Sequence, residues 1–257
     1  MSSALDSIVA GVLEDVAARQ ISIDEIKKKA SQAPSPRDAY VALNKPGTQI
    51  IAEIKRSSPS KGALATIADP VALGHSYEKG GAAVISVLTE QRRFGGKIED
   101  LVAVRDAVKI PVLRKDFIVT QFQVYETRAL GADLMLLIVA ALNDQQLRDY
   151  YTLAIDLGMN VLVEVHDKSE IERALKISPK IIGVNARNLK TLEINENAFA
   201  DLLPALPEEI LRVAESGIST RDQVYKAEQV GVKAILVGET LVRAGDPVRA
   251  ISTLLGK

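Results

Sequence analysis

The pattern of hydrophobic and polar positions changes early in the chain. At first, apolar residues between positions 5 and 16 recur at the i, i+3, i+4, i+7 spacing of an amphipathic helix. Ser3 followed by Asp6 resembles a capping box, and Ser22 is suited to begin a second short helix. A proline-containing stretch then interrupts the helical pattern. We predict that residues 1–48 form a helical extension without strands, as part of the same domain as the rest of the chain.

From residue 49 onward, apolar runs alternate with helical patterns. The predicted strands are residues 50–55, 82–89, 111–118, 132–140, 161–166, 181–187, 211–218 and 234–241. Helical patterns between them include residues 97–108, 143–158, 168–178 and 220–231. The expected N-caps are Asn143, Ser169 and Thr220, and the expected helix-ending glycines are Gly131, Gly158 and Gly231.

This alternation predicts an α/β fold, a (β/α)8 TIM barrel. The strand runs are almost continuously apolar, as expected of parallel strands covered on both faces. Eight βα units over residues 49–257 fit a barrel of this size. A doubly wound sheet is the alternative, but such a sheet usually carries a glycine-rich fingerprint after its first strand. Neither that fingerprint nor a P-loop occurs in the sequence.

Composition narrows the function classes. The net charge of −1 in 257 residues gives no overall field toward nucleic acid or an anionic membrane, so neither partner is expected. The longest apolar run, residues 134–142, is too short to span a bilayer. The acidic N-terminal stretch does not resemble a secretory signal, and we expect a cytoplasmic protein. The absence of cysteine and the presence of only two histidines exclude thiolate chemistry and a multi-histidine metal site.

Charged residues interrupt the odd-numbered strands. Glu53 and Lys55 lie two positions apart in the first strand and therefore on one side of it, while Lys115, Glu164 and Glu215 occupy the third, fifth and seventh. The even-numbered strands give no comparable charge except Arg187, which lies beside Asn185 at the end of the sixth strand. In a (β/α)8 barrel, alternate strands contribute side chains to one layer, and catalytic groups lie at the C-terminal mouth. For any single charge, a structural ion pair or an outward orientation is an adequate explanation. Because unpaired buried charges cost several kcal/mol, their repetition on alternate strands predicts a functional site.

A second group of residues points to phosphate. Gly217 and Gly238 lie where the seventh and eighth strands end. Loops at those two positions commonly hold a phosphate on backbone amides in barrels of this class. The alternative is that the two glycines only shape tight turns. We expect Glu239 to turn its carboxylate away and to offer only its amide.

The remaining polar positions are less specific. The loop of residues 56–68 is longer than the usual βα connection, which often indicates function. In the loop after the second strand, Arg92 and Arg93 are expected to be solvated, whereas Phe94 could fold over an aromatic ligand. His166 falls beyond the end of its strand, so we expect it to support the site from behind or to lie at the surface.

The segments AEIKRSSPSKG, SVLTE, VLRKDFI, GADLMLLIVA, LVEVH, GVNARNL, VAESGI and VGETLVR together resemble indole-3-glycerol phosphate synthase. They occur in order, one per strand, and the N-terminal segment resembles the extension that these enzymes carry over the barrel mouth. The resemblance implies a carboxy-lyase of tryptophan biosynthesis that uses no metal or organic cofactor. Its substrate would be 1-(2-carboxyphenylamino)-1-deoxyribulose 5-phosphate, and ring closure would release CO2 and water.

The resemblance also implies roles for residues. Lys115 would be the principal general acid, and Glu164 the general base or its electrostatic partner. Lys55 would hold the substrate carboxylate and assist proton transfer, and Glu53 would take part in dehydration. The other implied substrate contacts are Asn185, Arg187, Glu215 and Ser216. The implied phosphate end consists of Ser58, Gly217, Gly238 and the amide of Glu239. The implied wall around the aromatic ring consists of Phe94, Phe117 and Leu136.

Two alternatives stay open at this point. A barrel with a lysine nucleophile could act as a Schiff-base aldolase on a sugar phosphate. A barrel could also bind a phosphorylated ligand without turnover, although binding alone does not require three carboxylates around two lysines. In either case we expect a phosphorylated small molecule as the partner and a monomeric protein. Transient contact with other enzymes of the tryptophan pathway is a further hypothesis.

Overall fold

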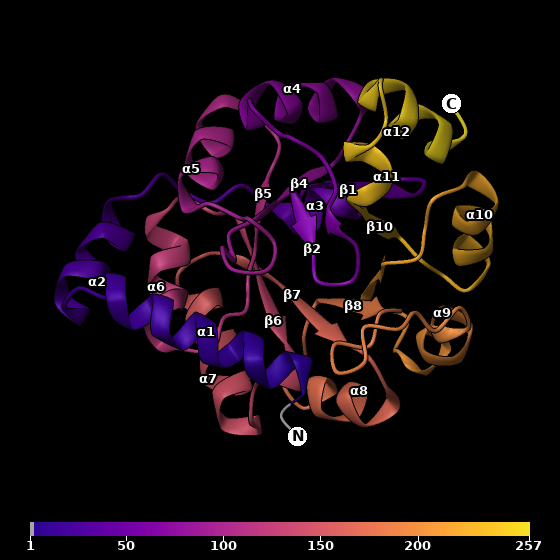
Figure 1. Cartoon of the computed structure of the whole chain (residues 1–257). Coiled ribbons are helices and arrows are strands. Elements are labelled where there is room, and N and C mark those ends of the chain that lie inside the picture. Colours follow the sequence, from indigo (N-terminus) through magenta and orange to yellow (C-terminus); the bar gives the residue numbers. More distant parts are fainter. Residues whose placement is uncertain (1–2) are drawn as a thin grey trace.

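Eight parallel strands close into a barrel in the computed structural model, which describes residues 3–257 (Figure 1). The barrel strands are β1 (Gln49–Ile54), β4 (Val84–Leu88), β5 (Val112–Lys115), β6 (Leu134–Ile138), β7 (Asn160–Val165), β8 (Ile181–Asn185), β9 (Leu211–Glu215) and β10 (Ala234–Val237). Strands that follow one another in the chain are adjacent in the barrel, and β10 pairs with β1 to close it. The predicted (β/α)8 barrel is therefore confirmed, and so are its eight strands, although each ends one to four residues earlier than predicted and helix α11 (Glu239–Val242) begins within the last predicted strand.

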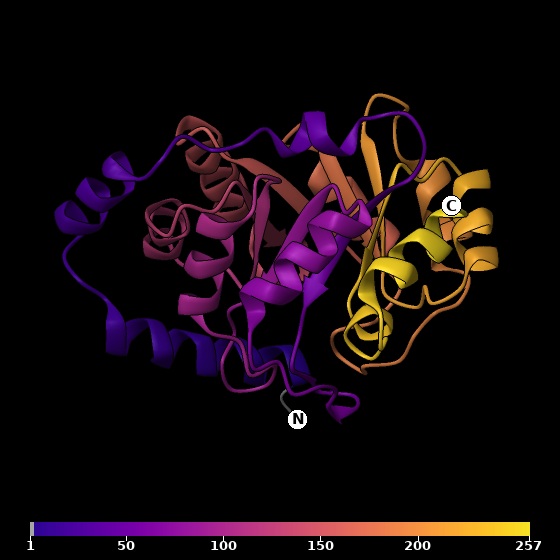
Figure 2. The same ribbon diagram turned by 90° about the horizontal axis from the view of Figure 1, so that it is seen from above.

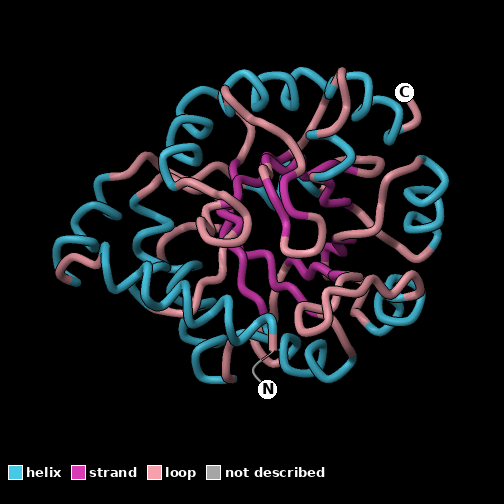
Figure 3. Tube along the Cα trace, viewed as in Figure 1, coloured by secondary structure: helices cyan, strands magenta, loops and turns pink. Residues whose placement is uncertain are grey.

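Helices form a ring outside the strands (Figure 3). They are α4 (Pro70–Gly80), α5 (Ile98–Ala107), α6 (Gln121–Ala129), α7 (Asp144–Asp156), α8 (Lys168–Leu175), α9 (Ala198–Leu202), α10 (Arg221–Gln229), α11 (Glu239–Val242) and α12 (Pro247–Leu255). Short 3-10 turns cover Val139–Ala141 and Leu203–Ala205. Asn143 and Thr220 cap α7 and α10 as predicted. The cap predicted at Ser169 is wrong, because Asp167, two residues after the end of β7, is the N-cap of α8 and its carboxylate accepts the Glu170 N–H at 2.9 Å.

The N-terminal segment runs from one end of the barrel to the other (Figure 2). Helix α1 (Ala4–Arg19) lies at the end that also carries the hairpin β2 (Ser57–Ser58) and β3 (Gly62–Ala63). Helix α2 (Ile23–Gln32) packs against α6, and α3 (Ala39–Leu43) lies at the opposite end. There the Ala39 amide donates to the side chain of Asn160, at the start of β7. The capping box at Ser3 is confirmed and no strand occurs within residues 3–48, but α3 was not predicted.

The loop after β4 docks against α1, which corrects one sequence-based expectation. Arg92 is not simply solvated, because its guanidinium pairs with Glu14 at 2.8 Å and with Asp15 at 2.7 Å on α1. Arg93 likewise donates to the Ser7 hydroxyl at 2.7 Å. Sequence alone does not show this contact, since it joins residues nearly eighty positions apart. The two arginines therefore fasten α1 to the mouth of the barrel.

A buried polar network lies outside the barrel beside β5. The guanidinium of Arg114 is fully buried and donates to Thr89, Thr127, Asp116 and Glu126, at 2.9–3.1 Å. Arg114 and Asp116 flank Lys115 in the chain, and their outward direction is the one that the strand periodicity predicts. This network, which we call the outer cluster, ties β5 to α6 and to the loop after β4.

Candidate active site

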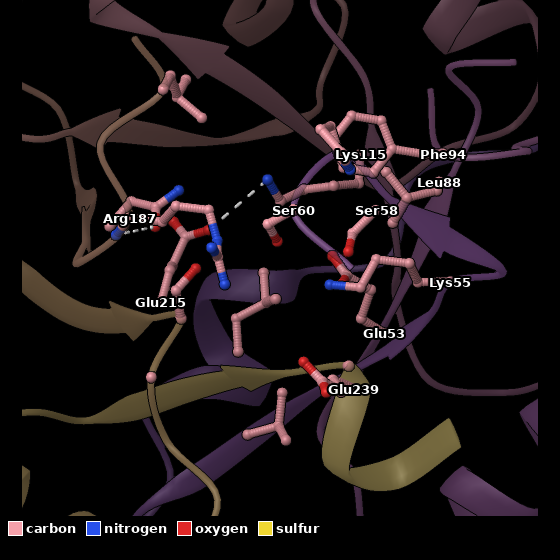
Figure 4. A pocket seen from close by; sticks show the side chains of 18 of the residues that line it. Glu53, Lys55, Ser58, Ser60, Leu88, Phe94, Lys115, Arg187, Glu215 and Glu239 are labelled. Carbon is pink, nitrogen blue, oxygen red and sulfur yellow. Dashed lines mark hydrogen bonds and ion pairs between the residues drawn. The ribbon is translucent and has the colours of Figure 1, made fainter. Parts of the chain in front are cut away.

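A cavity of about 490 Å³ opens at the C-terminal ends of the strands. Every residue that the sequence analysis named as a candidate site residue lines it, from Glu53 on β1 to Glu239 after β10 (Figure 4). The odd-numbered strands of the sequence-based prediction, now β1, β5, β7 and β9, do supply one cluster of charges. We call Glu53, Lys55, Lys115, Glu164 and Glu215 the mouth cluster.

Lys115 occupies the centre of the mouth cluster. Its Nζ donates to Glu164 Oε2 at 3.1 Å and lies 3.8 Å from Glu215 Oε2. In Figure 4 its side chain extends across the mouth toward Glu215. Both carboxylates are almost fully buried, whereas the lysine side chain keeps 15% of its surface exposed to the cavity. Of these three groups, only the ammonium is therefore appreciably accessible to an incoming ligand.

The electrostatics of this group separate the two glutamates. Burial lowers the pKa of Lys115, but the charges of Glu164, Glu215 and Glu53 outweigh burial and raise it overall, so the amine is an ammonium at neutral pH. Burial raises the pKa of Glu164, but Lys115 and His166 outweigh it, and the net shift is downward. Burial and the Glu164 charge together raise the pKa of Glu215 well above its ordinary value. Glu164 is therefore held ionised, whereas Glu215 favours the protonated form.

Glu53 and Lys55 form the second pair of the mouth cluster. Lys55 Nζ lies 2.6 Å from Glu53 Oε1, as their shared side of the strand predicts. Two glycines make room for the carboxylates. A side chain at Gly238 would collide with Glu53, and a side chain at Gly183 on β8 would collide with Glu215. Gly238 was predicted to line the phosphate end, and Gly183 was not predicted to matter; both positions leave room for buried carboxylates.

The loop after β9 adopts an unusual backbone. Ser216 has a φ of +66° and Gly217 a φ of +75°, so two successive residues are left-handed. Such a conformation is strained for serine, and strained residues of this kind concentrate at functional sites. Beside this loop, Gly238 follows the neighbouring strand β10, and helix α11 begins at the next residue. These two loops together line one part of the cavity with backbone.

Glu239 was expected to turn its carboxylate away from the site, and that expectation is wrong. Its side chain does not turn away from the mouth, because its carboxylate pairs with Lys61 of the β2–β3 hairpin at 2.8 Å and with Arg243 at 3.4 Å. The two cations neutralise the acid, which explains how a carboxylate is tolerated there. The pair with Lys61 also joins the loop after β1 to the loop after β10 across the mouth.

The aromatic wall is built from two loops. The rings of Phe94 and Phe117 lie 6.2 Å apart with an interplanar angle of 38°. The buried carboxylate of Glu90 accepts the backbone N–H groups of Arg92, Arg93 and Phe94, which fixes the loop that presents the Phe94 ring. An aromatic ligand could lie against these two rings.

Several lining residues escaped the sequence analysis. Ile8 of α1 belongs to an apolar helical stripe and so resembled a core residue, yet it lines the cavity. Lys61 lies in a polar loop and gave no distinguishing signal. His166 does not line the cavity: it supports the site from behind, one of the two positions expected for it, because its side chain is only 8% exposed and packs behind Glu164. Strand periodicity could not place it, since β7 ends at Val165.

The described residues contain neither a metal site built from histidine and carboxylate side chains nor a membrane-spanning helix. Within residues 3–257, no group of three or more histidine, aspartate or glutamate side chains is arranged to hold a metal ion. No helix in that part of the chain is long and apolar enough to cross a membrane.

A family model and individual relatives agree on the family that this chain resembles. The sequence model of the family "indole-3-glycerol phosphate synthase" matches residues 5–254. An indole-3-glycerol phosphate synthase from Mycolicibacterium smegmatis is 54% identical over 259 aligned residues, which cover 99% of this chain and 95% of the relative. One from Kineococcus radiotolerans is 54% identical and covers 98% and 94% of the two chains.

Solved structures resemble the fold at low sequence identity. The 3-hexulose-6-phosphate synthase from Salmonella typhimurium superimposes with a TM-score of 0.65 at 14% identity, covering 81% of this chain and 98% of the other. Thiamine phosphate pyrophosphorylase from Pyrococcus furiosus gives a TM-score of 0.62 at 15% identity, covering 84% and 96%. These likenesses support the barrel fold alone.

Proposed function

The chain belongs to the indole-3-glycerol phosphate synthase family, and we propose that the mouth cluster divides the acid–base steps of that reaction among its residues. The enzyme is a carboxy-lyase of tryptophan biosynthesis. It closes the indole ring of 1-(2-carboxyphenylamino)-1-deoxyribulose 5-phosphate and releases CO2 and water. The observation that supports the proposal most directly is the Lys115 ammonium, held between the buried side chains of Glu164 and Glu215 with its free side toward the cavity.

Lys115 is the general acid in this proposal. When the ring carbon that bears the carboxylate attacks the C2′ carbonyl, the new C–C bond leaves negative charge on the carbonyl oxygen. An ammonium aimed at that oxygen in a site of low polarity stabilises the charge and then protonates it. The raised pKa ensures that Lys115 carries the proton it must donate. Because ring closure joins two parts of one substrate, holding the substrate folded supplies much of the acceleration.

Glu164 accepts a proton in the later steps. Loss of CO2 returns its bonding electrons to the ring system, and loss of the former carbonyl oxygen as water completes the indole. Loss of CO2 releases no proton, because the substrate carboxyl group is already ionised. Dehydration breaks the C–O bond and removes a proton from the neighbouring carbon, and Glu164, which is ionised and next to the acid, would accept that proton. On the other side of the mouth, Lys55 would bind the substrate carboxylate, and Glu53 would take part in dehydration. Asn185, Arg187, Glu215 and Ser216 complete the substrate contacts.

The remaining lining residues fit the two ends of the substrate. Phe94, Phe117 and Leu136 would enclose the aromatic ring. The phosphate would lie against Ser58 and the backbone of Gly217, Gly238 and Glu239. For that to occur, Lys61 and Arg243 would have to share their charge between Glu239 and the phosphate. We further propose that residues 1–48 belong to the catalytic domain, since Ile8 lines the cavity, and that the enzyme works as a cytoplasmic monomer.

The proposal is tested with the Lys115→Ala variant in a fluorescence assay for indole-3-glycerol phosphate. We expect turnover to fall by at least about 10³-fold, because both the acid and the charge that stabilises the oxyanion are removed. Calorimetry should still detect substrate binding. The matched control is Lys226→Ala, an exposed lysine on α10, which should retain full activity.

Near-normal turnover by Lys115→Ala would refute the assignment. The Schiff-base alternative is examined in the same experiment by adding borohydride to the unchanged enzyme and its substrate. Covalent trapping of substrate on Lys115 would overturn the acid role, since an imine requires an unprotonated amine. The high pKa of Lys115 in the free site argues against that chemistry.

A further inference from the structure

A histidine that the proposed mechanism does not use lies directly behind Glu164. His166 follows β7, and its Nε2 lies 3.2 Å from Glu164 Oε1, an ion-pair distance at which neither atom forms a hydrogen bond within the described residues. Its Nδ1 lies 2.9 Å from Glu170 Oε2 on α8. The imidazole is almost completely buried between the two carboxylates. The two oxygens of Glu164 are thereby divided, one facing Lys115 and the other facing His166.

Glu170 fixes the histidine through both its backbone and its ring. The same carboxylate oxygen accepts the backbone N–H of His166 at 2.8 Å and faces the ring Nδ1 at 2.9 Å. Glu170 itself is held at the start of α8, where its amide donates to the cap residue Asp167 at 2.9 Å. The orientation of the imidazole is therefore set by the helix start and does not depend on a ligand.

The geometry also determines the charge of the ring. A neutral imidazole has one N–H donor and one acceptor nitrogen, and an ionised carboxylate only accepts. Because each ring nitrogen of His166 faces a carboxylate oxygen, only the doubly protonated ring suits both neighbours. In agreement, burial lowers the pKa of His166 but Glu164 and Glu170 raise it to about 10.

We propose that His166 is a positioning residue for Glu164: Glu170 fixes the imidazole, and the imidazole fixes the carboxylate oxygen that does not face Lys115. The inference rests on the proposed role of Glu164 as the base. The oxygen held by His166 is unavailable to the substrate, so proton transfer takes place at the oxygen beside the acid. The imidazolium also keeps the carboxylate ionised before each turnover.

Other charges around the ring favour the imidazolium. The groups that face it are Glu164 from β7, Glu170 and Asp167 from α8, and more distantly Lys115 from β5. On the outer side, Lys168 and Asp201 line a shallow groove together with the histidine. Carboxylates outnumber cations in this set, and the two closest groups are both carboxylates. Removing either close carboxylate should therefore weaken the hold on the ring proton.

The first test is nuclear magnetic resonance of the imidazole nitrogens in the full-length protein. The chain has only two histidines, so the variant His75→Gln assigns both signals. We expect both nitrogens of His166 to remain protonated at pH 8, and Glu170→Gln to lower its titration midpoint by at least one pH unit. Loss of a ring proton below pH 7 in the unchanged protein would overturn the proposal.

The second test is the pH profile of kcat for His166→Ala and Glu170→Gln. We expect kcat to fall about tenfold to a hundredfold, because a misplaced base loses its alignment. KM should change by less than about threefold. Without the neighbouring cation the pKa of Glu164 rises, so the acidic limb of the profile should move to higher pH. His75→Gln on α4 serves as the control and should leave the profile unchanged.

A purely structural role would give a different result. In that case, kcat would fall only in proportion to the folded fraction, measured by circular dichroism, and the acidic limb would stay in place. The variant Glu164→Gln separates this inference from the proposed function. Its kinetics test whether Glu164 is the base, while its effect on the His166 nitrogen signals tests the contact alone. Normal turnover by Glu164→Gln would refute the proposed function even if the His166 signals responded as expected.

Discussion

The outer cluster and the mouth cluster share strand β5 but are built in opposite ways. In the outer cluster, Arg114 has four hydrogen-bond partners, and its neighbour Asp116 is bonded to Thr89 as well. In the mouth cluster, neither oxygen of Glu215 accepts a hydrogen bond from any residue in the described part of the chain. The adjacent residues Arg114 and Lys115 therefore belong to two different networks: one in which the arginine has hydrogen-bond partners on every side, and one in which buried oxygens have none.

This contrast indicates how a buried charge in a strand can be interpreted. A buried polar group without a hydrogen bond costs about 1–3 kcal/mol, so a network that serves only the fold tends to satisfy its members. Groups that must bind a ligand cannot be fully satisfied beforehand. The mouth cluster keeps unpaired oxygens and a partly exposed ammonium, and under the proposed function the substrate completes it. The two clusters should therefore respond to substitution in different measurements.

The largest expected effect is on turnover in the mouth cluster. Glu164→Gln keeps the size of the side chain but removes its ability to accept a proton. We expect kcat to fall about 10²–10⁴-fold, in line with the usual contribution of general acid–base catalysis. The thermal midpoint should change by only a few degrees. Glu172→Gln, an exposed position on α8, is the matched control, and equal kcat values for the two variants would contradict the comparison.

The next effect is on stability in the outer cluster. Arg114→Met removes the central member of a buried ionic network: Asp116 loses its close cation, and Glu126 keeps only the partly exposed Arg19. We expect the free energy of unfolding, measured by urea titration, to fall by about 3–5 kcal/mol. The kcat of the folded fraction should stay within a few-fold of the original.

The matched change Arg148→Met, on the exposed face of α7, should cost less than about 0.5 kcal/mol. If Arg114→Met left stability intact and lowered kcat as strongly as Glu164→Gln, the distinction between the clusters would be wrong.

A third experiment uses pH to reveal the unsatisfied carboxylate. The pKa of Glu215 is higher in the folded protein than in the unfolded chain, so its contribution to stability is complete at low pH and is lost as pH rises. Glu215→Gln abolishes that loss. The stability of the variant relative to the original should therefore increase between pH 5 and pH 8, by at most about 1.4 kcal/mol per pH unit. Thermal melts at several pH values would measure it, and a constant difference across this range would contradict the sign.

The smallest effect is expected at the edge of the outer cluster. Arg19 of α1 donates twice to Glu126 but is partly exposed, and Glu126 keeps its bond to Arg114 when Arg19 is removed. Arg19→Ala should cost about 1 kcal/mol or less in urea titration. A loss as large as that of Arg114→Met would show that the network does not weaken toward its edge.

The sequence predicted the barrel and the mouth cluster for the same reason. A charge inside a continuous apolar run is conspicuous, and its strand parity gives its direction, so Glu53, Lys115 and Glu164 could be placed together without coordinates. Residues without such a contrast were missed. Ile8 is apolar on an apolar helix face, and Gly183 matters only through the space it leaves for Glu215.

Contacts between distant loops were the other source of error. The pairs Arg92–Asp15 and Lys61–Glu239 depend on how loops fold over the mouth, and local periodicity contains no information about that. His166 illustrates the boundary between the two cases. Its neighbour Glu164 could be placed by strand parity, but the strand ends one residue before the histidine. Its direction is set by Glu170 on the following helix.

The pairing of β1 with β10 has a consequence for how the protein is made. Glu53 of the first strand lies against Gly238, which follows the last, so the catalytic layer is incomplete until the end of the barrel has been synthesised. On the ribosome, a partial barrel would expose two unpaired strand edges, which are prone to pair with other chains. Slower synthesis of the last strand should therefore lengthen the time during which these edges can pair with other chains.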